Sequence, residues 1–180
     1  LEGSLTEVLG QHFYPAPVAA LLGEALAASV LLSGTLKFSG TLSLQAKSEG
    51  AVRLLFAECG HDRRIRGYAR VAEGALGEGL VALLGGGTLA ITITPDRGQR
   101  YQGVVPLDAP RLGDCLEHYF AQSEQLPTLI RLASDGTRAT GLLLQVLPER
   151  SAGQPGAAGQ WEHLSQLAAT VREAELLAEP

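Results

Sequence analysis

The sequence predicts an α+β fold in which strands cover one buried helix. Residues 18–36 are rich in Ala and Leu and place apolar side chains on nearly every face of a helix. Residues 37–107 contain alternating or β-branched stretches separated by turn signals, and residues 129–146 show the same pattern again. A helix that is apolar all round is either buried or membrane-spanning, and the length of this one favours burial between layers.

The amino-terminal helices are bounded by prolines. Residues 5–11 predict a short helical turn, which Pro15 and Pro17 stop. Pro17 also suits the first turn of the long helix, where its missing N–H costs no hydrogen bond. Gly23, Glu24 and Ser29 interrupt the apolar run, so it falls short of the roughly 18–20 residues that span a bilayer. We therefore expect no membrane partner.

The strands follow as hairpins. In residues 37–47, Phe38, Leu42, Leu44 and Ala46 share one face, as in a half-buried strand. Ile91 to Thr94 are all β-branched, which favours a strand. The remaining expected elements are strands at 52–57, 65–71, 88–94 and 101–107, a short helix at 76–84, a helix at 112–122, a hairpin of 129–133 with 140–146, a linker at 148–159 and one amphipathic helix at 161–178.

Composition excludes several classes of function. The chain has 180 residues and a formal net charge of −5, which gives little support to nucleic-acid binding. Its one basic cluster is Arg63, Arg64, Arg66 and Arg70. In strand-like sequence such a cluster is most simply a solvated sheet face, and an anion-binding patch is the alternative.

No catalytic or metal-binding set is evident. Cys59 and Cys115 are the only cysteines, and they lie too far apart in the sequence to form a CxxC motif. We expect Cys115 to be buried on its helix, whereas Cys59 precedes Gly60 at a strand end, where a loop position would expose it. The four histidines lack metal-ligand spacing, and the triglycine at 85–87 precedes a strand rather than a phosphate-binding helix. The sequence therefore predicts no catalytic, cofactor or metal residue, and hence no enzyme.

Several segments together resemble a known family. The YQG stretch at 101–103 and the SEQLP stretch at 123–127 occur in an order and spacing that is specific to it. The sequence is similar, over residues 9–175, to the amino-terminal domain of the heat-shock protein 33 family of redox-regulated holdase chaperones. The other segments that carry the resemblance are TLKFSG at 35–40, ITITP at 91–95, CLEHYF at 115–120 and GLLLQVLP at 141–148.

The resemblance implies a three-layer β/α/β sandwich with a buried central helix. Residues 1–148 would form the chaperone core, and residues 149–180 a helical linker to a zinc-binding redox-switch domain. The four zinc cysteines would lie beyond Pro180, so no cofactor is expected in this chain and zinc is expected only in the full-length parent. Because residue 1 is Leu, we also expect the natural chain to start earlier. The resemblance implies that the shortened amino-terminal segment includes a strand.

The implied function is ATP-independent binding of unfolding proteins under oxidative stress, in the cytoplasm, by a fragment without its disulfide switch. The expected partners are unfolded clients and a second copy of the chain. The alternative is a structural or dimerisation domain, since a missing edge strand would expose unpaired backbone. The candidate client-binding or interdomain surface consists of the apolar residues of the last helix, Leu164, Leu167, Val171, Leu176 and Leu177.

Overall fold

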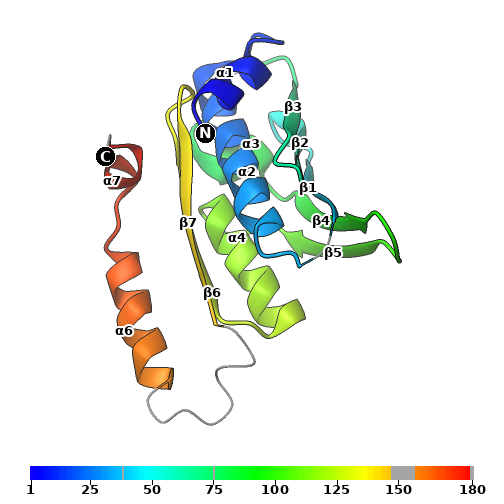
Figure 1. The fold of residues 1–180 in the computed structure, drawn as a ribbon. Helices are drawn as coiled ribbons and strands as arrows, with labels where there is room; N and C mark the ends of the chain where they lie inside the picture. Colours follow the sequence, from blue (N-terminus) through cyan, green and yellow to red (C-terminus); the bar gives the residue numbers. More distant parts are fainter. Residues whose placement is uncertain (38, 75, 147–156, 179–180) are drawn as a thin grey trace.

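A five-stranded antiparallel sheet forms one outer layer of the molecule (Figure 1). The computed structural model describes residues 1–37, 39–74, 76–146 and 157–178. The strands lie in the order β3-β2-β1-β4-β5. Leu44 on the central strand is opposite Ala57 and Ile91, and all three are buried on the inner face. The bounds are β1 Gly40–Lys47, β2 Val52–Gly60, β3 Ile65–Val71, β4 Thr88–Pro95 and β5 Tyr101–Pro106.

The middle layer contains the long apolar helix α2, Ala16–Ser33, as the sequence predicts. Its first turn contains Pro17, and Gly34 follows its end. By length and composition α2 could cross a membrane, but here it packs between the large sheet and a second hairpin, which explains its all-round hydrophobicity. Helix α4, Leu112–Tyr119, lies beside it and contacts both β5 and β6.

The second outer layer is the hairpin of β6, Thr128–Ser134, and β7, Ala139–Gln145. Its turn is closed by Asp135, whose Oδ1 accepts the backbone N–H groups of Thr137 at 2.8 Å and Arg138 at 2.7 Å. The expected three-layer β/α/β arrangement is confirmed. Two short helices complete the core domain, α1 Gly3–Leu9 and α3 Gly79–Leu84.

The expected single helix over 161–178 is wrong. The chain forms α6, Ala157–Ala169, and a separate short helix α7, Glu173–Leu177. Arg172 adopts an extended conformation between them, and its backbone N–H donates to the Glu175 carboxylate at 2.8 Å. This capping interaction starts a new helix at Glu173 because it satisfies a backbone donor that would otherwise continue α6.

Two further expectations need correction, and one is confirmed. Cys59 is fully buried within β2, because that strand continues to Gly60 rather than ending near Ala57. The helix expected over 112–122 ends as α4 at Tyr119 and continues as a π-helix, η1, over Phe120–Glu124. The basic cluster does include a solvated sheet face, since Arg66 and Arg70 lie exposed on the same side of β3.

Candidate functional site

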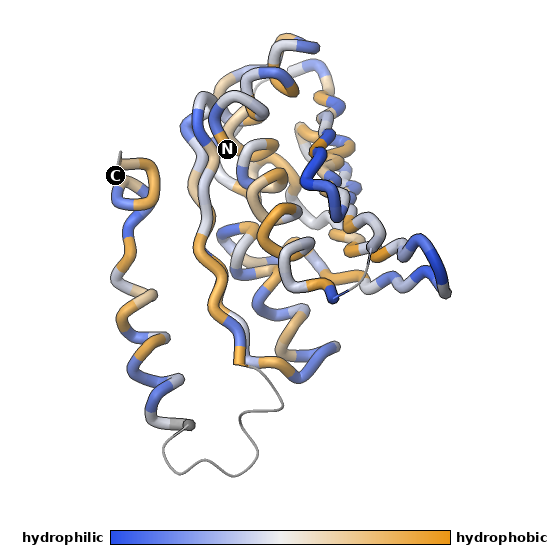
Figure 2. The backbone as a smooth tube through the Cα atoms, viewed as in Figure 1, coloured by the Kyte–Doolittle hydropathy of each residue, from blue (hydrophilic) through white to orange (hydrophobic). Residues whose placement is uncertain are grey.

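An apolar cleft of about 680 Å³ opens between the end of α2, the β4–β5 hairpin and η1. Figure 2 shows the hairpin tip beside it as hydrophilic, whereas α2 is largely hydrophobic. The apolar lining residues are Leu32, Leu36, Leu42, Ile91, Ile93, Pro95, Phe120 and Leu126. The polar lining residues, which can orient a bound molecule, are Thr35, Arg97, Gln99, Tyr101, Tyr119, Glu124 and Gln145.

Three polar side chains meet at the rim of this cleft. The Tyr119 hydroxyl lies 2.8 Å from the Glu124 Oε1 atom and 3.1 Å from the Tyr101 hydroxyl. The Tyr101 hydroxyl in turn donates to Glu124 at 3.1 Å. Burial, followed by the neighbouring Tyr101 and Glu124, raises the pKa of Tyr119 far above its usual value. Tyr119 is therefore a fixed hydrogen-bond donor and not an acid or base.

Gly103 allows Tyr119 to take this position. A Cβ atom at Gly103 would lie 2.3 Å from the Cε2 atom of the Tyr119 ring, so only glycine leaves room for the aromatic ring against β5. Tyr119 also meets Phe120 edge-on, with ring centroids 5.3 Å apart. The glycine thus couples strand β5 to the helix that carries the aromatic rim.

The π-helix supplies the third member of the rim cluster. The backbone N–H of Gln125 donates to the carbonyl of Phe120, five residues earlier, and Gln125 itself has a left-handed conformation with φ of 53°. The backbone N–H of Leu126 also donates to the Phe120 carbonyl at 3.1 Å. This wide turn places Glu124 beside both tyrosines. Such π segments occur frequently at functional sites.

The YQG and SEQLP segments, 20 positions apart along the chain, therefore converge on one rim. Tyr101 and Gly103 come from the first segment, and Glu124, Gln125 and Leu126 from the second. Sequence reasoning found the two segments but not the cleft. The other lining residues come from the end of α2 and the two residues Thr35 and Leu36 beyond it, and from β1, β4, the β4–β5 turn, α4, η1 and β7. The proximity of these elements depends on the tertiary fold.

The described residues offer no catalytic or metal-binding constellation. His12, His61, His118 and His163 are all exposed, and no three His, Cys, Asp or Glu side chains in the described ranges could hold a metal ion. Cys59 and Cys115 are free thiols, and burial raises the pKa of each. A buried thiol with a raised pKa is a poor nucleophile and a poor metal ligand.

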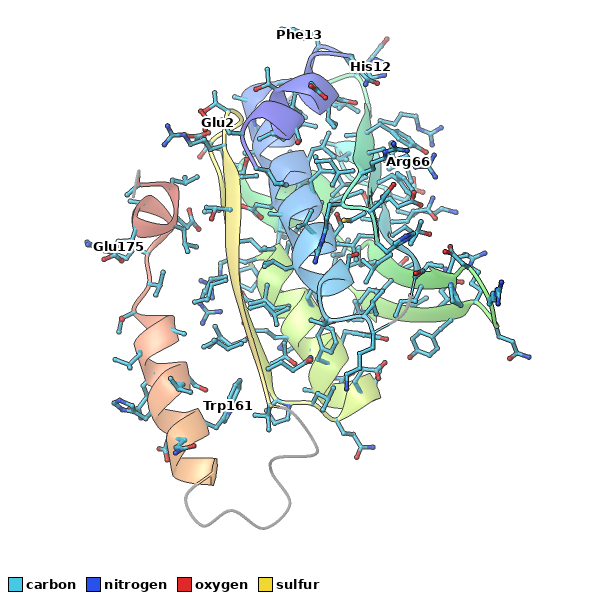
Figure 3. The ribbon with its side chains drawn as sticks, viewed as in Figure 1. Glu2, His12, Phe13, Arg66, Trp161 and Glu175 are labelled. Atoms are coloured by element: carbon cyan, nitrogen blue, oxygen red, sulfur yellow. The ribbon has the colours of Figure 1, made fainter. Side chains whose placement is uncertain are left out.

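The structure divides the apolar residues predicted from the last segment into two groups. Leu164 and Leu167 on α6 are 48% and 53% exposed, because the inward side of this helix consists of Trp161, Ser165 and Ala168. Figure 3 shows Trp161 pointing from α6 toward the end of the β6–β7 hairpin.

The other three residues belong to the docked part of the segment. Val171 and Leu176 line a cavity against β6, and Leu177 is half-buried beside them. The five side chains therefore do not form one continuous surface, since the break before α7 separates them. Whether either group binds clients or another domain stays a prediction.

Comparison with known proteins places this fold in a family. The sequence model of a family described as "Hsp33 protein" matches residues 1–180, the whole chain. The chain belongs to the Hsp33 family. Relatives described as 33 kDa chaperonin, from Pseudomonas paraeruginosa and Azotobacter vinelandii, are 54% and 53% identical over 99% and 98% of this chain. The chain spans 61% of the length of each of these two Hsp33 relatives.

A solved structure supports the same fold. The crystal structure of the 33 kDa chaperonin (HSP33) from Thermotoga maritima matches this chain with a TM-score of 0.85. The match covers all of this chain and 65% of that one, at 21% sequence identity. At this identity the likeness establishes the Hsp33 fold and leaves activity to be argued from the site.

Proposed function

We propose that this chain is the client-binding core of an ATP-independent holdase chaperone, and that its cleft takes an apolar segment of an unfolded polypeptide. The observation that carries the proposal is the cleft itself, since its floor is aliphatic and its rim is aromatic and hydrogen-bonded. Apolar side chains of an unfolding protein would gain free energy by leaving water there, without nucleotide hydrolysis.

Redox control under oxidative stress would need groups outside the described part of this chain. A zinc–cysteine switch requires four thiolate-type ligands, and the sequence has two cysteines, both buried on different elements. These residues do not fit a zinc site. Client binding by this chain should therefore proceed equally with and without peroxide, since the two thiols have raised pKa values and no access to solvent.

The test is suppression of light scattering by heat-unfolded citrate synthase, with and without ATP. Leu36 and Leu126 are half-buried cleft residues, so an aspartate at either position places a charge where the client segment would bind. We expect the Leu36→Asp and Leu126→Asp variants to need about tenfold more protein for half-maximal protection, which corresponds to about 1.4 kcal/mol.

Val81→Asp is the matched control, because Val81 is 57% exposed on α3 and lies outside the cleft. It should protect as the original chain does, and circular dichroism should show that all variants are folded. Equal protection by the cleft variants and the control would overturn the proposed site. A chain that never protects but forms dimers in static light scattering would instead support a structural or dimerisation domain.

A further inference from the structure

Glu24 is an unusual residue in its position. It is the only charged side chain on α2. It is half-buried and lines a cavity together with Glu173 of α7. Its carboxylate lines a cavity of about 500 Å³, which is separate from the cleft. Apolar side chains of β6 and the α7 segment line the same cavity, namely Ile130, Leu132, Val171 and Leu176.

The cations around this cavity are all engaged by other carboxylates. Arg111 makes two hydrogen bonds to Asp114, at 2.9 and 3.0 Å. Arg131 pairs with Glu117 at 2.8 Å, and Arg172 pairs with Glu175 at 3.3 Å. Figure 3 shows Glu175 pointing away from the hairpin, so this last pair lies on the outer side of α7.

Two carboxylates in the cavity are left without such a partner. Within the described ranges, neither Glu24 nor Glu173 has an ion pair or a side-chain hydrogen bond. Glu78 and Asp135 line the adjoining cavity with Glu24 and add further negative charge. Asp135 is already satisfied by the backbone N–H groups of its own turn. Docking of α7 therefore adds the charge of Glu173 to a site that is already acidic.

The proton affinity of Glu24 follows from this arrangement. Burial, followed by repulsion from Glu173, raises the pKa of Glu24 to about 7, whereas Arg111 acts in the opposite direction. Glu173 is exposed, so solvent screens its effect and burial dominates. Both causes weaken when α7 moves away, because the carboxylate then meets water.

We propose that Glu24 is a proton-controlled latch, so that α7 lies against β6 when this carboxyl is protonated and detaches more readily when it is charged. A group that binds its proton more tightly in the docked state favours docking at low pH. The stabilisation of the docked state of α7 is complete below the ordinary pKa of 4.5, and it is lost as the pH rises through about 7. Detachment would expose the apolar floor beneath α7 near neutral pH.

Hydrogen–deuterium exchange of residues 173–177 in the intact chain tests the latch, with rates corrected for intrinsic exchange. With pKa values of about 7 docked and 4.5 detached, protection should fall by up to about 30-fold between pH 5.5 and 8.5. Glu24→Gln should keep α7 protected at both pH values, with less than about twofold change. Glu162→Gln, on the exposed side of α6, is the control and should behave as the original chain.

Two outcomes would overturn the latch. One is protection of α7 that does not change between pH 5.5 and 8.5 in the original chain. The other is a Glu24→Gln variant that retains the full pH dependence. Glu173→Gln provides a second variant outside the core helix, and it should reduce the fall in protection without abolishing it. This experiment does not measure client protection. The proposal of a latch at Glu24 and the proposal that clients bind in the cleft can therefore be contradicted independently.

Discussion

Helix α2 and the α6–α7 segment are both rich in Leu and Ala, yet their surroundings are opposite. Most residues of α2 are buried, because the helix contacts a sheet on one side and a hairpin on the other. Among the described side chains of α6, only Ala168 is buried, and two leucines face solvent. Apolar composition thus predicts burial only where two layers are available to cover a helix, as Figure 1 shows for α2 but not for α6.

The largest expected difference between the two regions is the effect of truncating a leucine. Leu26 is fully buried on α2, so Leu26→Ala should lower the free energy of unfolding by about 2–5 kcal/mol. Leu164→Ala on α6 should change it by no more than about 0.5 kcal/mol. Urea denaturation followed by circular dichroism measures both. Similar losses for the two variants would show that α6 is covered in solution.

A matched pair of glycines gives a sharper comparison. Alanine favours a helix over glycine by about 1 kcal/mol. A Cβ atom at Gly23 on α2, however, would lie 2.2 Å from the Ser134 Oγ atom, so Gly23→Ala should destabilise by about 1–3 kcal/mol. At Gly159 on α6 nothing lies within 4 Å, and Gly159→Ala should be neutral or stabilising. The unfolding temperature should therefore fall for Gly23→Ala and stay the same or rise for Gly159→Ala. An equal fall in both variants would contradict the close packing at Gly23.

The smallest expected effect concerns the start of α7. Glu175→Ala removes the carboxylate that accepts the Arg172 backbone N–H, so α7 should fray without a change in the core. Faster hydrogen exchange at residues 173–177 and an unchanged urea midpoint are the expected results. A midpoint shift as large as that of Gly23→Ala would mean that α7 is part of the cooperative core.

The sequence was sufficient for elements whose signal is local. The β-branched run at Ile91–Thr94 locates β4 to within one residue. Pro15 and Pro17 mark the start of α2 to within two residues. It was insufficient where a specific hydrogen bond or strand pairing, rather than the spacing of apolar residues, decides the structure. The break between α6 and α7 depends on the Glu175 cap, and nothing in the periodicity of 161–178 reveals it. The burial of Cys59 depends on β2 extending to Gly60 between β1 and β3.

The candidate site shows the same limit. The YQG and SEQLP segments marked two parts of the cleft rim, because the resemblance rests on them. The contact between Gly103 and Tyr119, which joins those parts, requires the β5–α4 packing that only the folded chain provides. The cavity under α7 could not be predicted from the sequence either, because Glu24 and Glu173, which both line it, are far apart along the chain.

The π-helix after α4 also constrains how this chain can tolerate insertions and deletions. In an α-helix each residue advances by about 100° around the axis. The extra residue accommodated in η1 therefore sets the angular position of everything after Phe120. Loss of one residue between Phe120 and Glu124 could be absorbed by regular α-helical hydrogen bonding, but it would rotate Glu124 away from Tyr101 and Tyr119. The number of residues in this segment thus determines the geometry of the cleft rim as much as the identity of its side chains does.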